Sequence, residues 1–432
     1  MDVAVTTMLG VSDQLGRILV RPGLLHPPAS LSRPQANSRA TALRADGLGW
    51  EEHAADTPRF PGPAERLLFE AQRTNMVRNP RGEGAVADAH GTPGTLPANW
   101  SAGGPGLTRS IVGLGTEDGM PFIDVRISGT ATSGHYTFTA ESGFAHVSAG
   151  NGQTWTHSLF ARLIAGPARA TRCHLRQFNS TGGIAGDVVV TAPVFTTGRL
   201  AECRMTATGR LNQSATTRLQ AFHQVNFTTG SVIDDTWRLG WSQLELGPFA
   251  STPILPPIGT PGTATRGADG VSASLAELGI GENGACTILW SGAFDVTNIA
   301  SQQVIAAVDD GSNANRHMLR LGVSGIPEII RVTANAGALA SFGGAAVPPG
   351  TVVRAGCAID GAGRLAGVVM GFGDETVRAV TGGPAGGLTT LRLGSGAQAI
   401  MPGWAQTFAF RVLPYPLPDA ALPGAVAALP GG

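Results

Sequence analysis

The segment Thr154-Trp-Thr-His-Ser-Leu-Phe-Ala-Arg-Leu163 decides the fold class, because apolar and polar side chains alternate along it. A period of two is typical of a strand with one buried face. The predicted inward face carries Trp155, His157, Leu159, Ala161 and Leu163. The predicted outward face carries Thr154, Thr156, Ser158 and Arg162.

Similar short runs, separated by Gly, Asn and Ser, extend on both sides of this segment. They are Phe122–Ile127, Tyr136–Thr139, Arg172–Phe178, Asp187–Thr191, Leu200–Met205, Arg218–Val225 and Thr236–Leu246. About eight short strands at this spacing indicate an antiparallel sandwich or jelly roll. We therefore predict a jelly-roll domain over residues 66–252.

The chain outside this region divides into three further zones. Residues 1–65 are interrupted by prolines and predict an N-terminal arm that needs a partner to become ordered. Residues 253–270 are rich in Pro and Gly and predict a stiff linker. Strand patterns resume over residues 271–432, which predict a second β-sandwich with a short helix near Pro418–Leu429. The expected fold is all-β.

Composition excludes several function classes. The 432 residues contain 61 Gly and 29 Pro but only 14% charged residues, against roughly 25% in ordinary globular proteins. The 30 basic residues, all of them Arg, balance the 30 acidic residues, so no overall positive field favours nucleic acid. Without Lys there is no lysine nucleophile or Schiff base. We expect no secretory signal and no membrane insertion, and synthesis in the cytoplasm.

The four cysteines stand singly in strand-like runs, without zinc-type spacing. We expect Cys173, Cys203, Cys286 and Cys357 to be reduced core residues. A disulfide between Cys173 and Cys203 is the alternative. His157 lies on the apolar side of its strand and is predicted to be a core histidine.

Two sets of segments carry a family resemblance. The first set consists of Ser38–Ala42, Ala45–Gly47, Asp56–Phe60 and Leu67–Asn75, and it continues in Leu239–Pro253 and Thr265–Asp269. These segments resemble those that open and close the carbohydrate-binding-module-like jelly roll of phage tail and head fibre proteins. This chain departs from the family at Arg44, where an aromatic residue is usual, and in its short Phe60–Arg66 connection.

The second set, Gly403–Gln406 and Phe410–Leu422, resembles the last strand and terminal turn of concanavalin A/laminin-G sandwiches. The resemblance implies a spike or fibre on the surface of a virion or a gene-transfer-agent-like particle. It also implies attachment to host surface or capsular polysaccharide, contact with other particle proteins through residues 1–65, and a homo-oligomer, with a trimer favoured.

Catalytic and metal-binding patterns are sparse. Gly279–Gly284 spells GxGxxG, but a strand follows it instead of preceding it, so we interpret it as a turn. No nucleophile elbow occurs, and adjacent acids such as Asp234 and Asp235 point to opposite faces of a strand, which makes them poor glycosidase pairs. We therefore predict a non-enzymatic protein without a cofactor. The one weak Ca²⁺ candidate is the loop with Asp309, Asp310, Asn313 and Asn315.

Sugar binding requires exposed aromatic faces beside amides, carboxylates or Arg. The candidates for a glycan site are Trp100, His135, Tyr136, Arg162, Arg176 and Arg218. For Trp100, His135 and Tyr136 the alternative is a packing role within the fold. The three arginines lie in mid-strand on polar faces and would suit an acidic polysaccharide. Two alternatives stay open: a capsule depolymerase or esterase with a site between chains, and a structural decoration or adaptor protein that binds no glycan.

Overall fold

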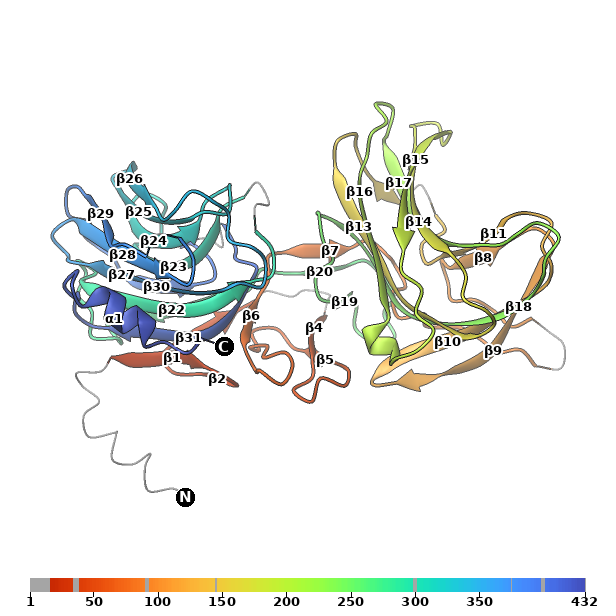
Figure 1. Ribbon diagram of the computed structural model, residues 1–432, viewed down its shortest axis with the longest axis horizontal. Coiled ribbons are helices and arrows are strands. Elements are labelled where there is room, and N and C mark those ends of the chain that lie inside the picture. The colour runs from red at the N-terminus through yellow and green to blue at the C-terminus, as the bar shows by residue number, and fades with distance from the viewer. Residues whose placement is uncertain are drawn as a thin grey trace, which may run out of the picture. The chain divides into compact units, whose positions relative to one another are not determined.

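The computed structural model describes residues 16–33, 39–89, 93–143, 146–297, 301–373, 375–397 and 401–431. They form an all-β protein of antiparallel sheets with one short α-helix, which confirms the expected fold class (Figure 1). Among the described residues, no helix is long and apolar enough to cross a membrane.

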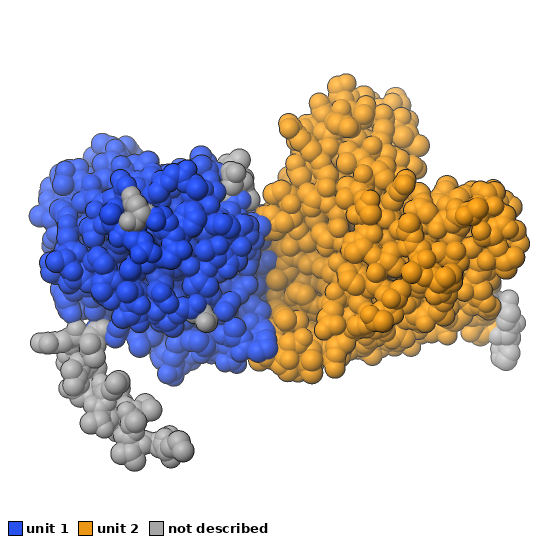
Figure 2. Space-filling model, in the orientation of Figure 1, with its two compact units in different colours: residues 1–34, 55–72, 267–432 blue, residues 35–54, 73–266 orange. Residues whose placement is uncertain are grey.

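The chain divides into two compact units, each assembled from separate parts of the sequence (Figure 2). Unit 1 comprises residues 1–34, 55–72 and 267–432, and unit 2 comprises residues 35–54 and 73–266. These units differ from the expected domains. Described residues of the 1–65 arm form strands of both units, and the expected 253–270 linker contains two strands of unit 2.

Unit 1 is a sandwich of an eight-stranded and a seven-stranded antiparallel sheet. The first sheet has the order β2-β1-β31-β22-β27-β28-β29, with β6 beside β31. Its strands are β1 (Arg17–Arg21), β2 (Leu24–Leu25), β6 (Leu67–Phe69), β22 (Cys286–Phe294), β27 (Val352–Ile359), β28 (Arg364–Met370), β29 (Arg378–Thr381) and β31 (Ala405–Leu413).

The second sheet of unit 1 has the order β26-β25-β24-β23-β30-β21-β3. Its strands are β3 (Ser30–Ser32), β21 (Gly270–Ser274), β23 (Gln303–Asp309), β24 (Arg316–Leu321), β25 (Pro327–Thr333), β26 (Ala336–Ser341) and β30 (Thr390–Leu393). One hydrophobic core fills the space between the two sheets. The helix α1 (Leu422–Ala427) begins with a proline in its first turn and packs Leu422 and Val426 against the outer side of the eight-stranded sheet.

Unit 2 is a second sandwich, built from a five-stranded and a six-stranded antiparallel sheet. The five-stranded sheet has the order β16-β13-β18-β10-β9, with strands β9 (Leu107–Glu117), β10 (Met120–Thr130), β13 (Thr154–Ala165), β16 (Arg204–Arg210) and β18 (Val232–Leu246). The six-stranded sheet has the order β15-β14-β17-β11-β8, with β12 beside β17. Its strands are β8 (Ser101–Gly103), β11 (His135–Thr139), β12 (Val147–Ser148), β14 (Thr171–Phe178), β15 (Ile184–Ala192) and β17 (Arg218–Asn226).

Short strands complete unit 2: β4 (Arg39–Leu43), β5 (Trp50–His53) and β19 (Ile254–Leu255) form one sheet, and β7 (Arg73–Asn75) and β20 (Ala264–Arg266) form another. The fully buried Asn75 fixes these pieces to the sandwich. Its amide donates to the carbonyls of Ser242 and Ile254, and its oxygen accepts from the backbone N–H groups of Val77 and Leu244. Every polar atom of this side chain is therefore satisfied in the core.

The core of unit 2 lies between its two large sheets and confirms the predicted inward face of the opening segment, whereas Thr156 and Ser158 of the opposite face are not exposed but buried, at 1% and 2%. Trp155, Leu159 and Leu163 of β13 are buried there, beside residues of β14 and β17. The side chains that alternate to the other side of the six-stranded sheet face outward. Their positions define the candidate site.

Candidate functional site

Two of the predicted glycan-binding residues are part of the core of unit 2. The indole N–H of Trp100 donates to the carbonyl of Asn79 at 2.8 Å, and its ring is 8% exposed. The ring of Tyr136 is 1% exposed and packs edge-on against Phe138, and burial raises the pKa of its hydroxyl to about 12. Neither residue presents a flat face to solvent, so their contribution is to packing.

Arg162 lies on the outer side of the five-stranded sheet, in a network of ion pairs. It contacts Glu117 at 3.1 Å, and Arg238 contacts both Glu117, at 2.6 Å, and Asp124, at 2.8 Å. A third arginine on this side, Arg126, binds Asp234 through two hydrogen bonds. These pairs match three arginines with three carboxylates, so Arg162 and its neighbours in the network have little charge left for a ligand.

The remaining three predicted residues share the outward side of the six-stranded sheet. His135, Arg176 and Arg218 lie on β11, β14 and β17, which are consecutive neighbours in the sheet in the order β14-β17-β11. We call this side the arginine–amide face. It is formed by His135, Thr137, Arg172, His174, Arg176, Asp187, Arg218, Gln220, Phe222, Gln224 and Asn226.

Strand register places these side chains in rows across the sheet. Arg176 lies between Asp187 of β15 and Gln220 of β17, and Gln224 lies between Arg172 of β14 and Thr137 of β11. Figure 2 shows the surface of unit 2 hollowed between the lobe with β14, β15 and β17 and the lobe with β8 and β11, and the six-stranded sheet runs from one lobe to the other.

A stack of planar groups forms the centre of the arginine–amide face. The imidazole of His174 lies parallel to the ring of Phe222, with 4.8 Å between ring centroids. The guanidinium group of Arg176 lies over the same ring at 4.9 Å and donates two 2.9 Å hydrogen bonds to Asp187. Phe222 itself is buried, so the surface of the stack consists of polar planar groups.

Asp187 holds these groups in place. Burial alone would raise the pKa of its carboxyl, but hydrogen bonds from Arg176 and His174 lower it below its ordinary value. Burial lowers the pKa of His174, with Asp187 opposing the shift. At neutral pH the carboxylate is therefore charged and fixed, and the imidazole is largely neutral.

The arginine–amide face has an excess of positive charge. β14 places Arg172 and Arg176 there, and the carboxylate of Asp187 on β15 is bound to Arg176. Arg172 is exposed and has no ion-pair partner among the described residues. Three amides lie on the same face, at Gln220, Gln224 and Asn226. Each donates one hydrogen bond within the protein, to the carbonyl of Ser142, the amide oxygen of Asn226 and the carbonyl of Ala170, and each keeps a second N–H for a ligand. This combination can form bidentate hydrogen bonds with carboxylates and vicinal hydroxyls.

Sequence reasoning missed the amides and Arg172, although a signal for them exists. In β17, the segment Arg218-Leu-Gln-Ala-Phe-His-Gln-Val-Asn226 places polar residues at every second position except Phe222. If β17 is paired with β14, the polar residues of the two strands fall on one side of the sheet, and the arginine–amide face can be identified. The register of the two strands depends on the tertiary structure and cannot be predicted from the sequence of either strand alone.

The weak Ca²⁺ candidate loop is held together by its own hydrogen bonds. Asp309 is buried and accepts two hydrogen bonds from Arg392, at 2.7 and 3.2 Å. Asp310 accepts from the backbone N–H and hydroxyl of Ser312 and from the amide of Asn315, and Asn313 accepts from Arg316. These donors use the oxygens that a cation would require, so the loop does not fit Ca²⁺ well.

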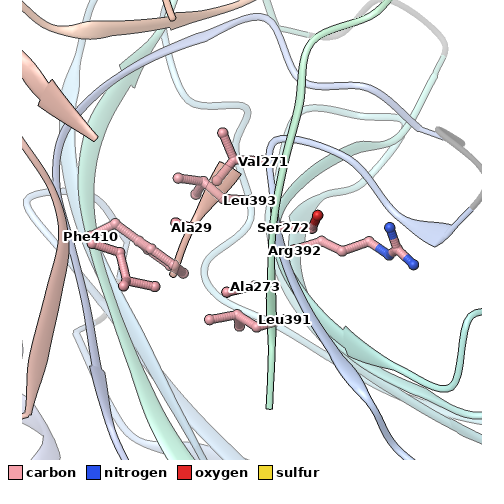
Figure 3. A pocket seen from close by; sticks show the side chains of 9 residues that line it. Ala29, Val271, Ser272, Ala273, Leu391, Arg392, Leu393 and Phe410 are labelled. Atoms are coloured by element: carbon pink, nitrogen blue, oxygen red, sulfur yellow. The ribbon is translucent and has the colours of Figure 1, made fainter. Parts of the chain in front are cut away.

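Other hollows of the described residues lie away from the arginine–amide face. In unit 2, Asn151, Gly152, Arg210, Leu211 and Asn212 line an open depression. In unit 1, a narrow gap between β1 and β31 on one side and β21 and β30 on the other is lined mainly by Leu19, Val271, Leu391, Leu393 and Phe410 (Figure 3). This gap has no room for a water molecule and belongs to the core.

Comparison with known proteins gives fold-level likenesses only. No family model and no curated protein matches the chain. Similar solved structures include the Ruminococcus gnavus IT-sialidase CBM40 bound to α2,3-sialyllactose, at 15% identity over 35% of this chain and 85% of that one, with a TM-score of 0.28. A CBM4 structure is 16% identical over 39% and 99% of the two chains, with a TM-score of 0.24. A tailspike domain of bacteriophage CBA120 is 12% identical over 34% and 19%, with a TM-score of 0.22.

Proposed function

We propose that this protein is a non-enzymatic attachment protein of a phage or gene-transfer-agent-like particle, and that its arginine–amide face binds an acidic polysaccharide of the host surface. The observation that supports this function is the charge excess on an outward sheet face that also carries three amides. Carboxylated sugars offer the matching chemistry: an anion for Arg172 and Arg176, and hydroxyls for Gln220, Gln224 and Asn226.

Such a site binds weakly on its own, because the interactions are few and the surface is open to water. Attachment then depends on several copies engaging one polymer at once. We therefore include in the proposal a homo-oligomer, with a trimer favoured, displayed on the particle surface. Particle contact through residues 1–65 stays a prediction.

The decisive experiment measures binding of the full chain to acidic and neutral polysaccharides, by calorimetry or on a glycan array. The most informative variant is Arg172→Ala, because this side chain is exposed and its removal breaks no ion pair. The matched control is Arg126→Ala, an exposed mid-strand arginine on the other sheet. Losing one charge-assisted hydrogen bond is worth about 2 kcal/mol, so we expect affinity to fall about thirtyfold for Arg172→Ala and to stay nearly constant for the control.

Absence of binding to every acidic polysaccharide, or equal losses in the two variants, would contradict the assignment of the face. Incubation with the same polymers followed by measurement of reducing ends and released acyl groups tests the enzymatic alternatives. We expect no turnover. Sustained release of either product would overturn the non-enzymatic assignment.

A further inference from the structure

Three potential metal ligands from three strands meet inside the core of unit 2. They are His157 of β13, Cys173 of β14 and His223 of β17, and all three are at most 2% exposed. Each offers one ligand atom, and these atoms lie within 4.8 Å of one another. Cys173 and His223 are direct cross-strand partners in the six-stranded sheet, while His157 approaches from the five-stranded sheet (Figure 1).

A hydrogen-bond chain orients the first of these ligands. The hydroxyl of Ser242 donates to the carbonyl of Ser158, so its oxygen is free to accept from Nε2–H of His157 at 3.3 Å. This pattern leaves Nδ1 of His157 unprotonated, and Nδ1 lies 3.5 Å from Sγ of Cys173. A metal-bound histidine typically has its other ring nitrogen fixed in this way.

His223 supplies the second, independent observation. Neither of its ring nitrogens has a hydrogen-bond partner among the described residues, although the side chain is buried. Its ring lies beside that of His157, with 4.7 Å between centroids and a tilt of 39°. An unsatisfied buried polar group costs about 1–3 kcal/mol, and packing alone does not require a histidine at this position.

We propose that His157, Cys173 and His223 form a buried three-coordinate site for a single Cu(I) ion. Ordinary metal–nitrogen and metal–sulfur bonds place two such ligand atoms about 3.5 Å apart, which matches the separation of Nδ1 and Sγ. One thiolate and two imidazoles are the ligand types that copper favours.

Charge selects the oxidation state of the metal. No Asp or Glu joins the cluster among the described residues, so the one anionic ligand is the thiolate of Cys173. Cu(I) and one thiolate give a neutral site, whereas a divalent ion would leave a net positive charge in an apolar core. The binding step breaks the S–H bond of Cys173, releases that proton to solvent and forms a copper–sulfur bond. Copper enters as Cu(I), so no electron is transferred.

Burial of all three ligands means that the ion enters while unit 2 folds. The full chain would be unfolded in denaturant with reductant, without oxygen, and refolded with Cu(I) supplied as its acetonitrile complex. After removal of loose metal with a chelator, copper per chain is measured by mass spectrometry. We expect one copper per chain, a higher melting temperature than after refolding without copper, and an X-ray absorption spectrum of one sulfur and two nitrogen ligands.

Variants separate this site from adventitious thiol binding. Cys173→Ala and His223→Gln should each lower retained copper by at least about tenfold. The control is the Cys286→Ala/Cys357→Ala double variant, which removes two other buried thiols, both in unit 1. It should retain copper.

Circular dichroism shows whether the variants fold. If they do not, the absorption spectrum and the melting shift of the unaltered chain still decide the question. Copper retained by Cys173→Ala, copper lost from the double variant, or one Zn²⁺ retained per chain in place of Cu(I) would each overturn the proposal.

Discussion

Arg59 and Asp269 form a completely buried ion pair in unit 1, with 2.5 Å between Nη2 of the arginine and Oδ2 of the aspartate. Arg33 binds the other oxygen of Asp269 at 2.9 Å, and Glu70 binds Arg59 at 2.7 Å. Two cations and two anions therefore neutralise each other in the interior. The pairs join three separate parts of the sequence, and Arg59, Glu70 and Asp269 belong to segments that carried the family resemblance.

Removing the shared carboxylate should destabilise unit 1 strongly. In Asp269→Asn, two buried guanidinium groups lose an anionic partner, and breaking a buried pair typically costs about 3–5 kcal/mol. The control is Asp234→Asn, which breaks the exposed pair with Arg126 and should leave stability nearly unchanged, because water screens this pair. Chemical denaturation followed by tryptophan fluorescence measures both values. Equal losses would show that the buried pair is not a major source of stability.

Glycan binding should weaken as ionic strength rises. Salt screens interactions between exposed charges beyond a Debye length of about 10 Å at 0.1 M. We expect the affinity of the full chain for an acidic polysaccharide to fall roughly fivefold between 0.1 and 0.5 M salt, and less steeply in Arg172→Ala. Titrations at several salt concentrations give this slope. A slope that is unchanged in the variant would exclude Arg172 from the contact.

Acid should destabilise unit 1 through His317. Burial, with a smaller contribution from the charge of Arg331, lowers the pKa of this side chain from 6.5 to about 4. The unfolded chain takes up the proton near pH 6.5 and the folded chain only near pH 4. Stability is therefore present above pH 6.5 and is lost as the pH falls from 6.5 to 4, by up to about 3 kcal/mol. His317→Gln should show a correspondingly shallower decline in denaturation curves over this range, and an identical decline would contradict the assignment.

The four cysteines should be unreactive in the native protein. All four are buried and free, and burial raises the pKa of Cys173 and of Cys357 to about 12. A thiol reagent such as Ellman's reagent should label none of them before denaturation and all four afterwards, with a copper chelator present. Rapid labelling of the native chain would show that one of these strands opens readily.

The longer strands could be predicted from the sequence, and the short ones could not. The alternation around Trp155 and Leu159 identifies β13 and its inward face correctly. β1 and β6 contain only five and three residues, too few to show a period, and their partner β31 lies at the far end of the sequence. The N-terminal residues were therefore interpreted as an arm, although most of those described are strand and loop segments of the two units.

The candidate site could also be predicted only in part, because the sequence does not show which strands are neighbours. Polar alternation placed Arg176 and Arg218 on an outward face, but it could not show which strands are neighbours. Trp100 and Tyr136 are candidates because flat rings suit sugars, with packing within the fold as the alternative role. In the structure, the free energy gained by burying a large ring has placed them in the core. The cluster of His157, Cys173 and His223 has no spacing signal, because its members come from three strands in two sheets.

The pairing of β1 with β31 has a consequence for biosynthesis. Arg17 is opposite Val412 in this ladder, so β1 pairs along one edge with a strand that is synthesised almost 400 residues later. Unit 2 contains no residue beyond position 266, so it can fold before β31 is synthesised. During that time one edge of β1 has no strand beside it. Truncation before Ala405 would remove β31 and leave β1 paired with β2 alone, with its other edge exposed and prone to aggregate.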